Sequence, residues 1–177
     1  MNTATMSAPS LFKPTKTITI TNHATPRVFI SSPFRPVLTD AERKTLPATE
    51  LMELRDQRFM DNVVTALTAC AFAVANGKLP MAPHAYFTRF LDDDDPEERA
   101  KGIRLGNDWL MNCEELWVMG ETISPGMKDE IQLASQLGLP IKYFIPYNVT
   151  NTAAAAEYYL PVEEPTQATQ AAQSIQH

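Results

Sequence analysis

The chain has 177 residues, of which 44% are hydrophobic, and its formal net charge is -6 at neutral pH. This length and apolar content predict one domain with a substantial core and room for extra segments at either end. The negative charge argues against a general nucleic-acid binder, although it is compatible with a local basic pocket for one phosphate.

The two cysteines, Cys70 and Cys113, lie in apolar runs and form no CxxC pair. We expect buried free thiols, no secretory leader and a reducing, cytoplasmic location. No apolar run approaches the roughly 20 residues that span a bilayer, so we expect no membrane segment. Without a zinc-type cysteine and histidine cluster, a P-loop or a GxGxxG pattern, we expect neither a metal nor a cofactor.

The first half of the chain begins with a segment, residues 1–26, that is rich in Thr, Ser, Ala and Pro and predicts a flexible arm. The run "RVFISS", from Arg27, predicts a short buried strand. The stretch from Glu50 to Gly77 predicts a long helix that ends at the glycine. The following "LPMAPHAYF", residues 79–87, is bounded by proline and predicts an extended segment.

A second helix is predicted over "PEERAKGIRLGNDWLMNC", residues 96–113, after an acidic run "DDDDPEER". Asp95 as N-cap, Pro96 at the first helical position and Glu98 at the third predict a capping box. A magnesium site is the alternative interpretation of this acidic run. The capping interpretation is favoured because acids are common at helix starts.

The second half predicts a buried strand at "ELWVMG", a helix in "SPGMKDEIQLASQLG" and a buried strand at "PIKYFI". Ser124 is a good N-cap for this helix, and Gly138 is a natural stop. Residues 149–177 are biased to Ala, Gln, Thr and Pro and predict a mostly disordered tail, in which "AEYYL" could dock locally.

Strands that alternate with helices in this order predict one domain over residues 27–148. We expect a doubly wound α/β fold of flavodoxin or Rossmann type, with a mainly parallel sheet of four to five strands and helices on both faces. In such sheets ligands bind beyond the carboxyl ends of the strands. The segments "SSPFRP", "PHAYF" and "GETISPGMKDE" should therefore converge on one site.

Glu130 is the acid that this convergence singles out, because it lies on the flank of the apolar stripe of its helix. As a structural residue, it would be a partly exposed carboxylate that favours the helix start. As a functional residue, it would face the pocket. Arg35 could hold a phosphate or carboxylate together with Ser124, although a surface arginine and a plain N-cap are the alternatives. His84 could be a base or a hydrogen-bonded structural histidine.

Four segments together resemble the nucleoside 2-deoxyribosyltransferase-like superfamily: "VFISSPFR", "PHAYF", "WLMNCEELWVMG" and "ISPGMKDEIQLASQLGLPI". The likeness covers residues 27–146; it is greatest to an uncharacterised phage-type branch and more distant to the 2′-deoxynucleoside 5′-monophosphate N-glycosidases. The resemblance implies that Glu130 is the nucleophile that attacks the anomeric carbon of the sugar. It also implies that Arg35 and Ser124 hold the 5′-phosphate.

The sequence departs from this pattern at three positions. Phe29 replaces the tyrosine of the first strand, Gly106 stands where a carboxylate is expected, and Lys128 replaces the second glycine of the phosphate loop. Asp108, His84 or Glu121 could instead assist the departing base, and the sequence does not choose among them. The substrate-binding residues that we expect are Phe29, Ser31, Ser32, Phe34, Arg35, Ser124, Gly126 and Met127.

These patterns predict a nucleotide or deoxynucleotide N-glycosidase or deoxyribosyltransferase that acts through Glu130. A non-catalytic protein that senses or sequesters a nucleotide-derived signal is the alternative, and a purely structural role on the same fold is a third. The long helix from Glu50 to Asn76 carries apolar residues on more than one side, which predicts a homodimer or larger assembly. A terminal segment that folds back over this helix would instead leave the chain monomeric.

Overall fold

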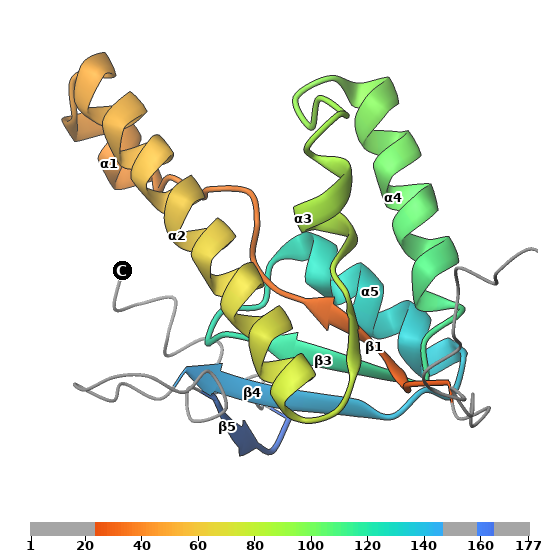
Figure 1. Cartoon of the computed structure of the whole chain (residues 1–177). Helices are drawn as coiled ribbons and strands as arrows, with labels where there is room; N and C mark the ends of the chain where they lie inside the picture. The colour runs from red at the N-terminus through yellow and green to blue at the C-terminus, as the bar shows by residue number, and fades with distance from the viewer. Residues whose placement is uncertain (1–23, 147–158, 165–177) are drawn as a thin grey trace, which may run out of the picture.

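The computed structural model describes residues 24–146 and 159–164, which form a mixed α/β structure around one five-stranded sheet (Figure 1). The strands are ordered β2-β1-β3-β4-β5. The first four are parallel, and β5 pairs with β4 in the antiparallel direction. Their bounds are β1 Arg27–Ser31, β2 Leu79–Met81, β3 Glu115–Met119, β4 Ile141–Pro146 and β5 Tyr159–Val162.

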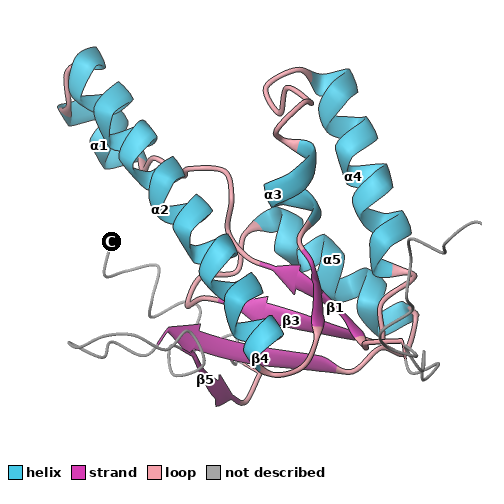
Figure 2. Ribbon diagram, viewed as in Figure 1, coloured by secondary structure: helices cyan, strands magenta, loops and turns pink. Residues whose placement is uncertain are grey.

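Helices cover both faces of the sheet (Figure 2). The buried side chains of α2 pack on one face, and those of α4 and α5 pack on the other. The N-terminal half of α2, together with α1, projects beyond the sheet as an arm (Figure 1). The helix bounds are α1 Asp40–Thr45, α2 Ala48–Ala75, α3 Pro83–Phe87, α4 Pro96–Leu110 and α5 Pro125–Gln136.

The alternation of β1 divides the core into two layers. Val28 and Ile30 are fully buried against the α2 layer, whereas Phe29 is buried against α4 and α5. Ser31 has the parity of Phe29 and is also fully buried, so its hydroxyl points to the α5 side of the sheet. The first strand therefore delivers a polar group into an otherwise apolar layer.

Two local predictions are corrected by the structure. The segment after β2 is not extended throughout, because Pro83 starts the short helix α3 at a position that suits proline. Glu98 does not complete the capping box at Asp95: its carboxylate accepts a hydrogen bond from the N–H of Asp92 at 2.6 Å. Asp95 is the N-cap as predicted, and its Oδ1 accepts from the N–H groups of Glu97 and Glu98 at 2.9 Å each.

Two elements were missed by the sequence analysis. Helix α1 has a capping box in which Thr39 and Glu42 each accept a backbone N–H of the other. Strand β5 lies within the segment that was predicted as a mostly disordered tail. The N-terminal run "TITIT" and residues 165–177 lie outside the described residues.

Helix α2 also corrects the expectation that no apolar run approaches a membrane-spanning length. By length and composition it could cross a bilayer, although only 22% of its most apolar window is buried in the structure. One such helix is weak evidence of a membrane segment, because the mostly buried core helix of a soluble protein and a signal sequence pass the same test of length and composition. Ala69, Phe72 and Ala73 pack in the core against the sheet, as expected of a helix that covers a sheet.

Candidate functional site

The candidate site lies at the carboxyl ends of β1 and β3, where the strand order reverses. The chain runs from β1 to the neighbour on one side, β2, and from β3 to the neighbour on the other side, β4. Such reversal points are the usual ligand sites of open α/β sheets. The loops after the two strands approach closely: a Cβ on Gly120 would lie 3.6 Å from Cδ of Pro33. Gly120 has φ 109°, a conformation that favours glycine.

The first contact at this site joins Ser31 to Glu130. The hydroxyl of Ser31, at the last position of β1, donates to Oε2 of Glu130 on α5 at 2.5 Å. Burial raises the pKa of the Glu130 carboxyl to about 7, although the bond from Ser31 acts in the opposite direction. A carboxyl with this pKa exchanges its proton near neutral pH, as a catalytic acid or base does, and its ionised form is available as a nucleophile.

The second contact joins the next residue, Ser32, to His84. The Ser32 hydroxyl lies 2.9 Å from Nε2 of His84, in the first turn of α3. Burial lowers the pKa of His84 to about 4, so the imidazole is uncharged at neutral pH. The ring of Phe34 packs edge-on against His84, with a centroid distance of 5.3 Å. Consecutive serines of one strand end thus hold a carboxyl and an imidazole.

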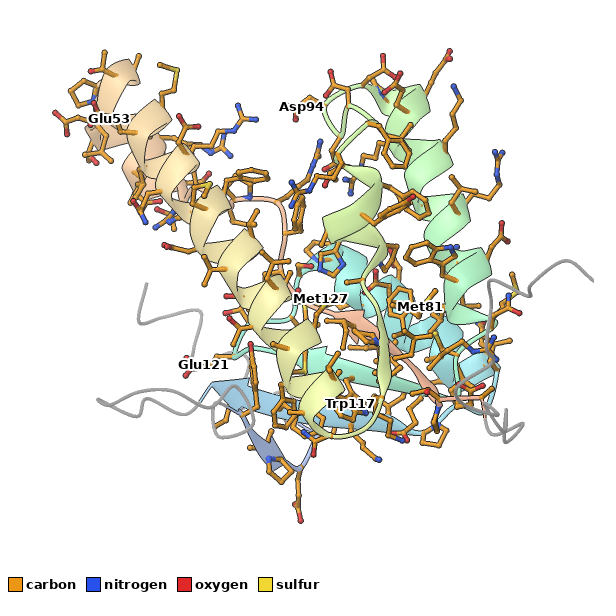
Figure 3. All side chains as sticks on the ribbon, viewed as in Figure 1. Glu53, Met81, Asp94, Trp117, Glu121 and Met127 are labelled. Atoms are coloured by element: carbon orange, nitrogen blue, oxygen red, sulfur yellow. The ribbon has the colours of Figure 1, made fainter. Side chains whose placement is uncertain are left out.

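Arg35 lies in a different environment, within an exposed cluster of ion pairs. Its Nε donates to Oδ2 of Asp93 at 2.6 Å, and its Nη2 lies 3.2 Å from Oδ1 of Asp94. Asp94 points from the loop between α3 and α4 toward the arm (Figure 3), where its Oδ2 accepts from Arg55 at 2.9 Å. Asp93 also pairs with Arg99 at 2.8 Å. We call Arg35, Arg55, Arg99, Asp93 and Asp94 the arginine–aspartate cluster.

A cavity of about 790 Å³ lies beside this cluster, between the arm and the loop after α3. Phe34 and Phe59 contribute aromatic rings to its wall, and these rings pack edge-on at a centroid distance of 5.3 Å. Because Phe34 also contacts His84, the cavity is adjacent to the Ser32–His84 pair. The cationic side chains in its lining are Arg35, Arg43 and Arg55, and the anionic ones are Asp56, Asp92, Asp93 and Asp94.

The start of α5 matches its predicted role as a cap. The Ser124 hydroxyl accepts from the N–H of Met127 at 3.3 Å. Gly126 is exposed, and a Cβ added there would meet nothing within 4 Å, so the helix start is open to solvent at this position. The side chains of Met127 and Phe29 are buried in the α4–α5 layer of the core, so only their backbone atoms could contact a ligand there.

The three candidates for assisting a departing base differ in placement. His84 is half-buried beside Ser32, whereas Asp108 on α4 and Glu121 after β3 are exposed. Gly106, where a carboxylate was expected, is buried, and a Cβ there would lie 3.5 Å from Pro83 of α3. The absence of a longer side chain at position 106 lets α3 pack closely on α4.

The structure brings Ser31, Ser32, His84 and Glu130 together at one strand end, with Phe34 beside them. It connects Arg35 to the arginine–aspartate cluster, and the described contacts do not join it to Ser124 or Glu130. Arg43, Arg55 and Phe59 could not be recognised from the sequence as residues of a cavity, because no motif marks the approach of the arm to the loop after α3. No group of three His, Cys, Asp or Glu side chains suited to a metal occurs in residues 24–146 and 159–164.

A family model described as a domain of unknown function (DUF7768) matches residues 26–144, from the start of β1 into β4. The chain belongs to this family. None of the curated proteins matches the chain. The match encloses Ser31, Ser32, His84, Glu130 and the arginine–aspartate cluster.

Proposed function

We propose that the protein cleaves or transfers the N-glycosidic bond of a nucleotide or deoxynucleotide, with Glu130 as the nucleophile. The observation that carries this proposal is the Ser31–Glu130 contact: a carboxyl with a raised pKa, held at the carboxyl end of β1. The resemblance to the nucleoside 2-deoxyribosyltransferase-like superfamily supports the same role. The strand order 2-1-3-4, with helices on both faces, supports a flavodoxin-like, doubly wound fold.

In the proposed reaction, an ionised Glu130 oxygen forms a bond to the anomeric carbon while the bond from that carbon to the base breaks. The base leaves with the bonding electron pair and receives a proton. Water, or a second base, then releases the sugar from Glu130. Because the Ser31 hydroxyl donates a hydrogen bond to Oε2 of Glu130, we assign the attack to Oε1.

His84 has a defined part in this scheme. With a pKa near 4 it is uncharged at neutral pH, which makes it a poor general acid but a suitable neutral hydrogen-bonding group for the base. Asp108 and Glu121 remain the proposed acids for the departing base. Arg35 would bind the phosphate only after its contact with Asp93 is exchanged for the ligand.

The test is incubation of the purified protein with a panel of nucleotides and deoxynucleotides, with free base measured by chromatography. We expect base release by the wild type, loss of release in Glu130→Gln and retention in Asp129→Asn. Asp129 is the matched control because it is the adjacent acid of the same helix and is exposed. Equal activity in the two variants would remove Glu130 from the mechanism.

A non-catalytic nucleotide-binding protein is the second candidate, and Gly106 is the observation that favours it. The position expected to carry a helper carboxylate is packed against Pro83 instead. This candidate predicts that a nucleotide raises the melting temperature without release of base; a ligand at about 100 times its Kd adds roughly 2.7 kcal/mol. Catalytic release of base would exclude it. We place either function in the cytoplasm, without a metal, a cofactor or a nucleic-acid polymer as partner.

A further inference from the structure

An apolar stripe runs along the face of α2 that points away from the sheet. Met60, Val64, Leu67, Ala71 and Val74 follow one another at spacings of four, three, four and three residues, and all five are exposed. The exposed fraction is 50% for Leu67 and 61% for Val74. We call these five residues the α2 seam.

The seam is distinct from the face by which α2 joins its own domain. Ala66, Ala69, Phe72 and Ala73 are the buried residues of the helix, and they fall between the seam positions. The α2 helix lies in the foreground of Figure 1, and no other described helix or strand crosses in front of it there. Strand β5 reaches only the flank, where the Tyr159 hydroxyl donates to the carbonyl of Thr65 at 3.2 Å. One helix therefore carries two apolar faces, of which the fold covers one.

The spacing and the charges of the seam indicate what could cover it. A repeat of four and three residues is the pattern by which two helices pack along a shared line. Residues 62–75 of α2 contain no charged side chain, so the partner must present an uncharged surface about four turns long. Residues 1–23, 147–158 and 165–177 of this chain contain no four-three apolar repeat of five positions; the longest repeat in these segments, from Met1 through Ala4 and Ala8 to Leu11, has four positions. A second copy supplies a matching surface by identity.

We propose that the α2 seam is a self-association surface on which a second copy of the chain docks through its own α2, antiparallel about a two-fold axis. With the axis between Val64 and Leu67, each Val64 lies opposite a Leu67 of the other copy. Met60 then lies opposite Ala71, which pairs a large side chain with a small one at both ends. Asp61, the charged residue beside the seam, lies opposite Cys70 rather than a second Asp61, so no like charges meet.

Light scattering on the full-length protein over a wide concentration range tests the proposal. We expect the mass of a dimer for the wild type and of a monomer for Leu67→Glu. The matched control is Ile103→Glu on α4, whose exposed fraction is 52%, close to that of Leu67, and this variant should remain a dimer. A monomeric wild type, or a dimer unchanged by Leu67→Glu, would overturn the proposal.

A rescue experiment tests the pairing itself and does not depend on the stability of one variant. Mixing Leu67→Glu with Val64→Lys places the new carboxylate opposite the new ammonium at one of the two equivalent contacts, so we expect a mixed dimer. Mixing Leu67→Glu with Val74→Lys should give none, because these positions are not opposed. Mixed dimers in both combinations would contradict the proposed register.

Flotation with phosphatidylcholine–phosphatidylglycerol vesicles separates self-association from the other surface that an apolar helix face could meet. We expect the wild type to remain unbound. A monomer that floats with the vesicles would overturn the proposal and assign the seam to a lipid surface. None of these measurements uses catalytic activity, so their failure is distinguishable from failure of the proposed reaction.

Discussion

The two ends of the segment from Ser31 to Arg35 show two ways of holding charge in one small domain. At one end, Ser31 and Ser32 are almost fully buried and each makes one short hydrogen bond to an ionisable group. At the other end, Arg35 belongs to a cluster whose side chains remain at least partly exposed, with exposed fractions from 30% for Asp93 to 69% for Asp94. Burial, rather than the number of contacts, separates the two ends.

The difference has energetic consequences. Ion pairs in water contribute about 0 to 1 kcal/mol each, because water solvates both partners almost as well when they are apart. A buried polar group without its partner costs about 1 to 3 kcal/mol, because nothing replaces the lost bond. Changes at the buried serines should therefore alter stability and pKa values, whereas changes in the arginine–aspartate cluster should leave both nearly unchanged.

The largest effect is expected from Glu130→Gln. The carboxyl has a pKa of about 7 in the fold against an ordinary value of 4.5, so the folded state binds more protons between these values. Stability contributed by this group is complete below about pH 4.5 and is lost as the pH rises to about 7. Glutamine cannot ionise, so the variant should equal the wild type at pH 4.5 and exceed it at pH 8 by up to about 3 kcal/mol.

Urea denaturation of both proteins across this pH range measures the difference. Asp129→Asn is the control: because the Asp129 charge is the smallest of the causes that act on the pKa of Glu130, this variant should keep most of the pH dependence of the wild type. If Glu130→Gln is the less stable protein at pH 8, the carboxylate is stabilised in the fold and its pKa is not raised. The same raised pKa predicts that base release increases as the pH rises through 7, because the attacking form of Glu130 is the ionised one.

His84 should show the opposite dependence. Its pKa is about 4 in the fold against an ordinary value of 6.5, so the unfolded chain binds the extra proton between these values. Its contribution to stability is present above pH 6.5 and is lost as the pH falls toward 4. At pH 4.5 this loss amounts to about 2.5 kcal/mol, and His84→Gln should remove it.

The measurement for His84 is the change in unfolding free energy between pH 7.5 and pH 4.5 in the wild type and in His84→Gln. If the unfolding free energy of the variant changes between these two pH values by the same amount as that of the wild type, His84 titrates normally. Because the windows of His84 and Glu130 overlap between pH 4.5 and 6.5, their slopes partly cancel in the wild type. The Glu130→Gln variant therefore shows the pH dependence of stability that His84 causes, and the His84→Gln variant shows the pH dependence that Glu130 causes.

The two ends of this segment also differ in how well their contacts could be predicted from the sequence. Glu130 was identified because helix periodicity placed an acid beside an apolar stripe, and the strands placed its helix at the sheet edge. The Ser32–His84 contact joins residues 52 positions apart, and no local pattern encodes their distance. Arg35 was placed correctly after β1, but its partners come from an acidic run whose loop conformation the sequence does not determine.

The helices and strands likewise differ in how well they could be predicted from the sequence. Long periodic segments gave α2, α4 and α5 to within a few residues, because their apolar faces repeat several times. The short helix α3 was misassigned, since five residues carry little periodicity and the prolines also suit a strand end. Strand β5 includes Pro161, a residue that favours edge positions, and its pairing with β4 follows from the sheet rather than from local preference.

Ser31→Ala should have an intermediate effect. Above pH 7 the Ser31 hydroxyl donates to a charged carboxylate, and its removal should cost about 1 to 2 kcal/mol in urea denaturation. Because this bond lowers the pKa of Glu130, the variant should also titrate Glu130 at a higher pH than the wild type. Ser32→Ala is the control and should leave the titration of Glu130 in place. An unchanged Glu130 titration in Ser31→Ala would argue that the contact does not persist in solution.

The smallest effect is expected from Asp94→Asn. Asp94 bridges Arg35 and Arg55 at 3.2 Å and 2.9 Å, but it is the most exposed acid of the cluster, and the asparagine keeps an oxygen for one of the arginines. The stability should change by less than about 0.5 kcal/mol, and the difference should vanish at about 1 M salt.

Asp93→Asn sharpens the comparison, because Asp93 is only 30% exposed and pairs with both Arg35 and Arg99. Loss of the Asp93 charge should therefore cost more stability than loss of the Asp94 charge. Urea denaturation at low and high salt gives both values. If Asp94→Asn loses as much stability as Ser31→Ala, the loop after α3 anchors the arm. Burial would then not explain the difference between the two ends of the segment from Ser31 to Arg35.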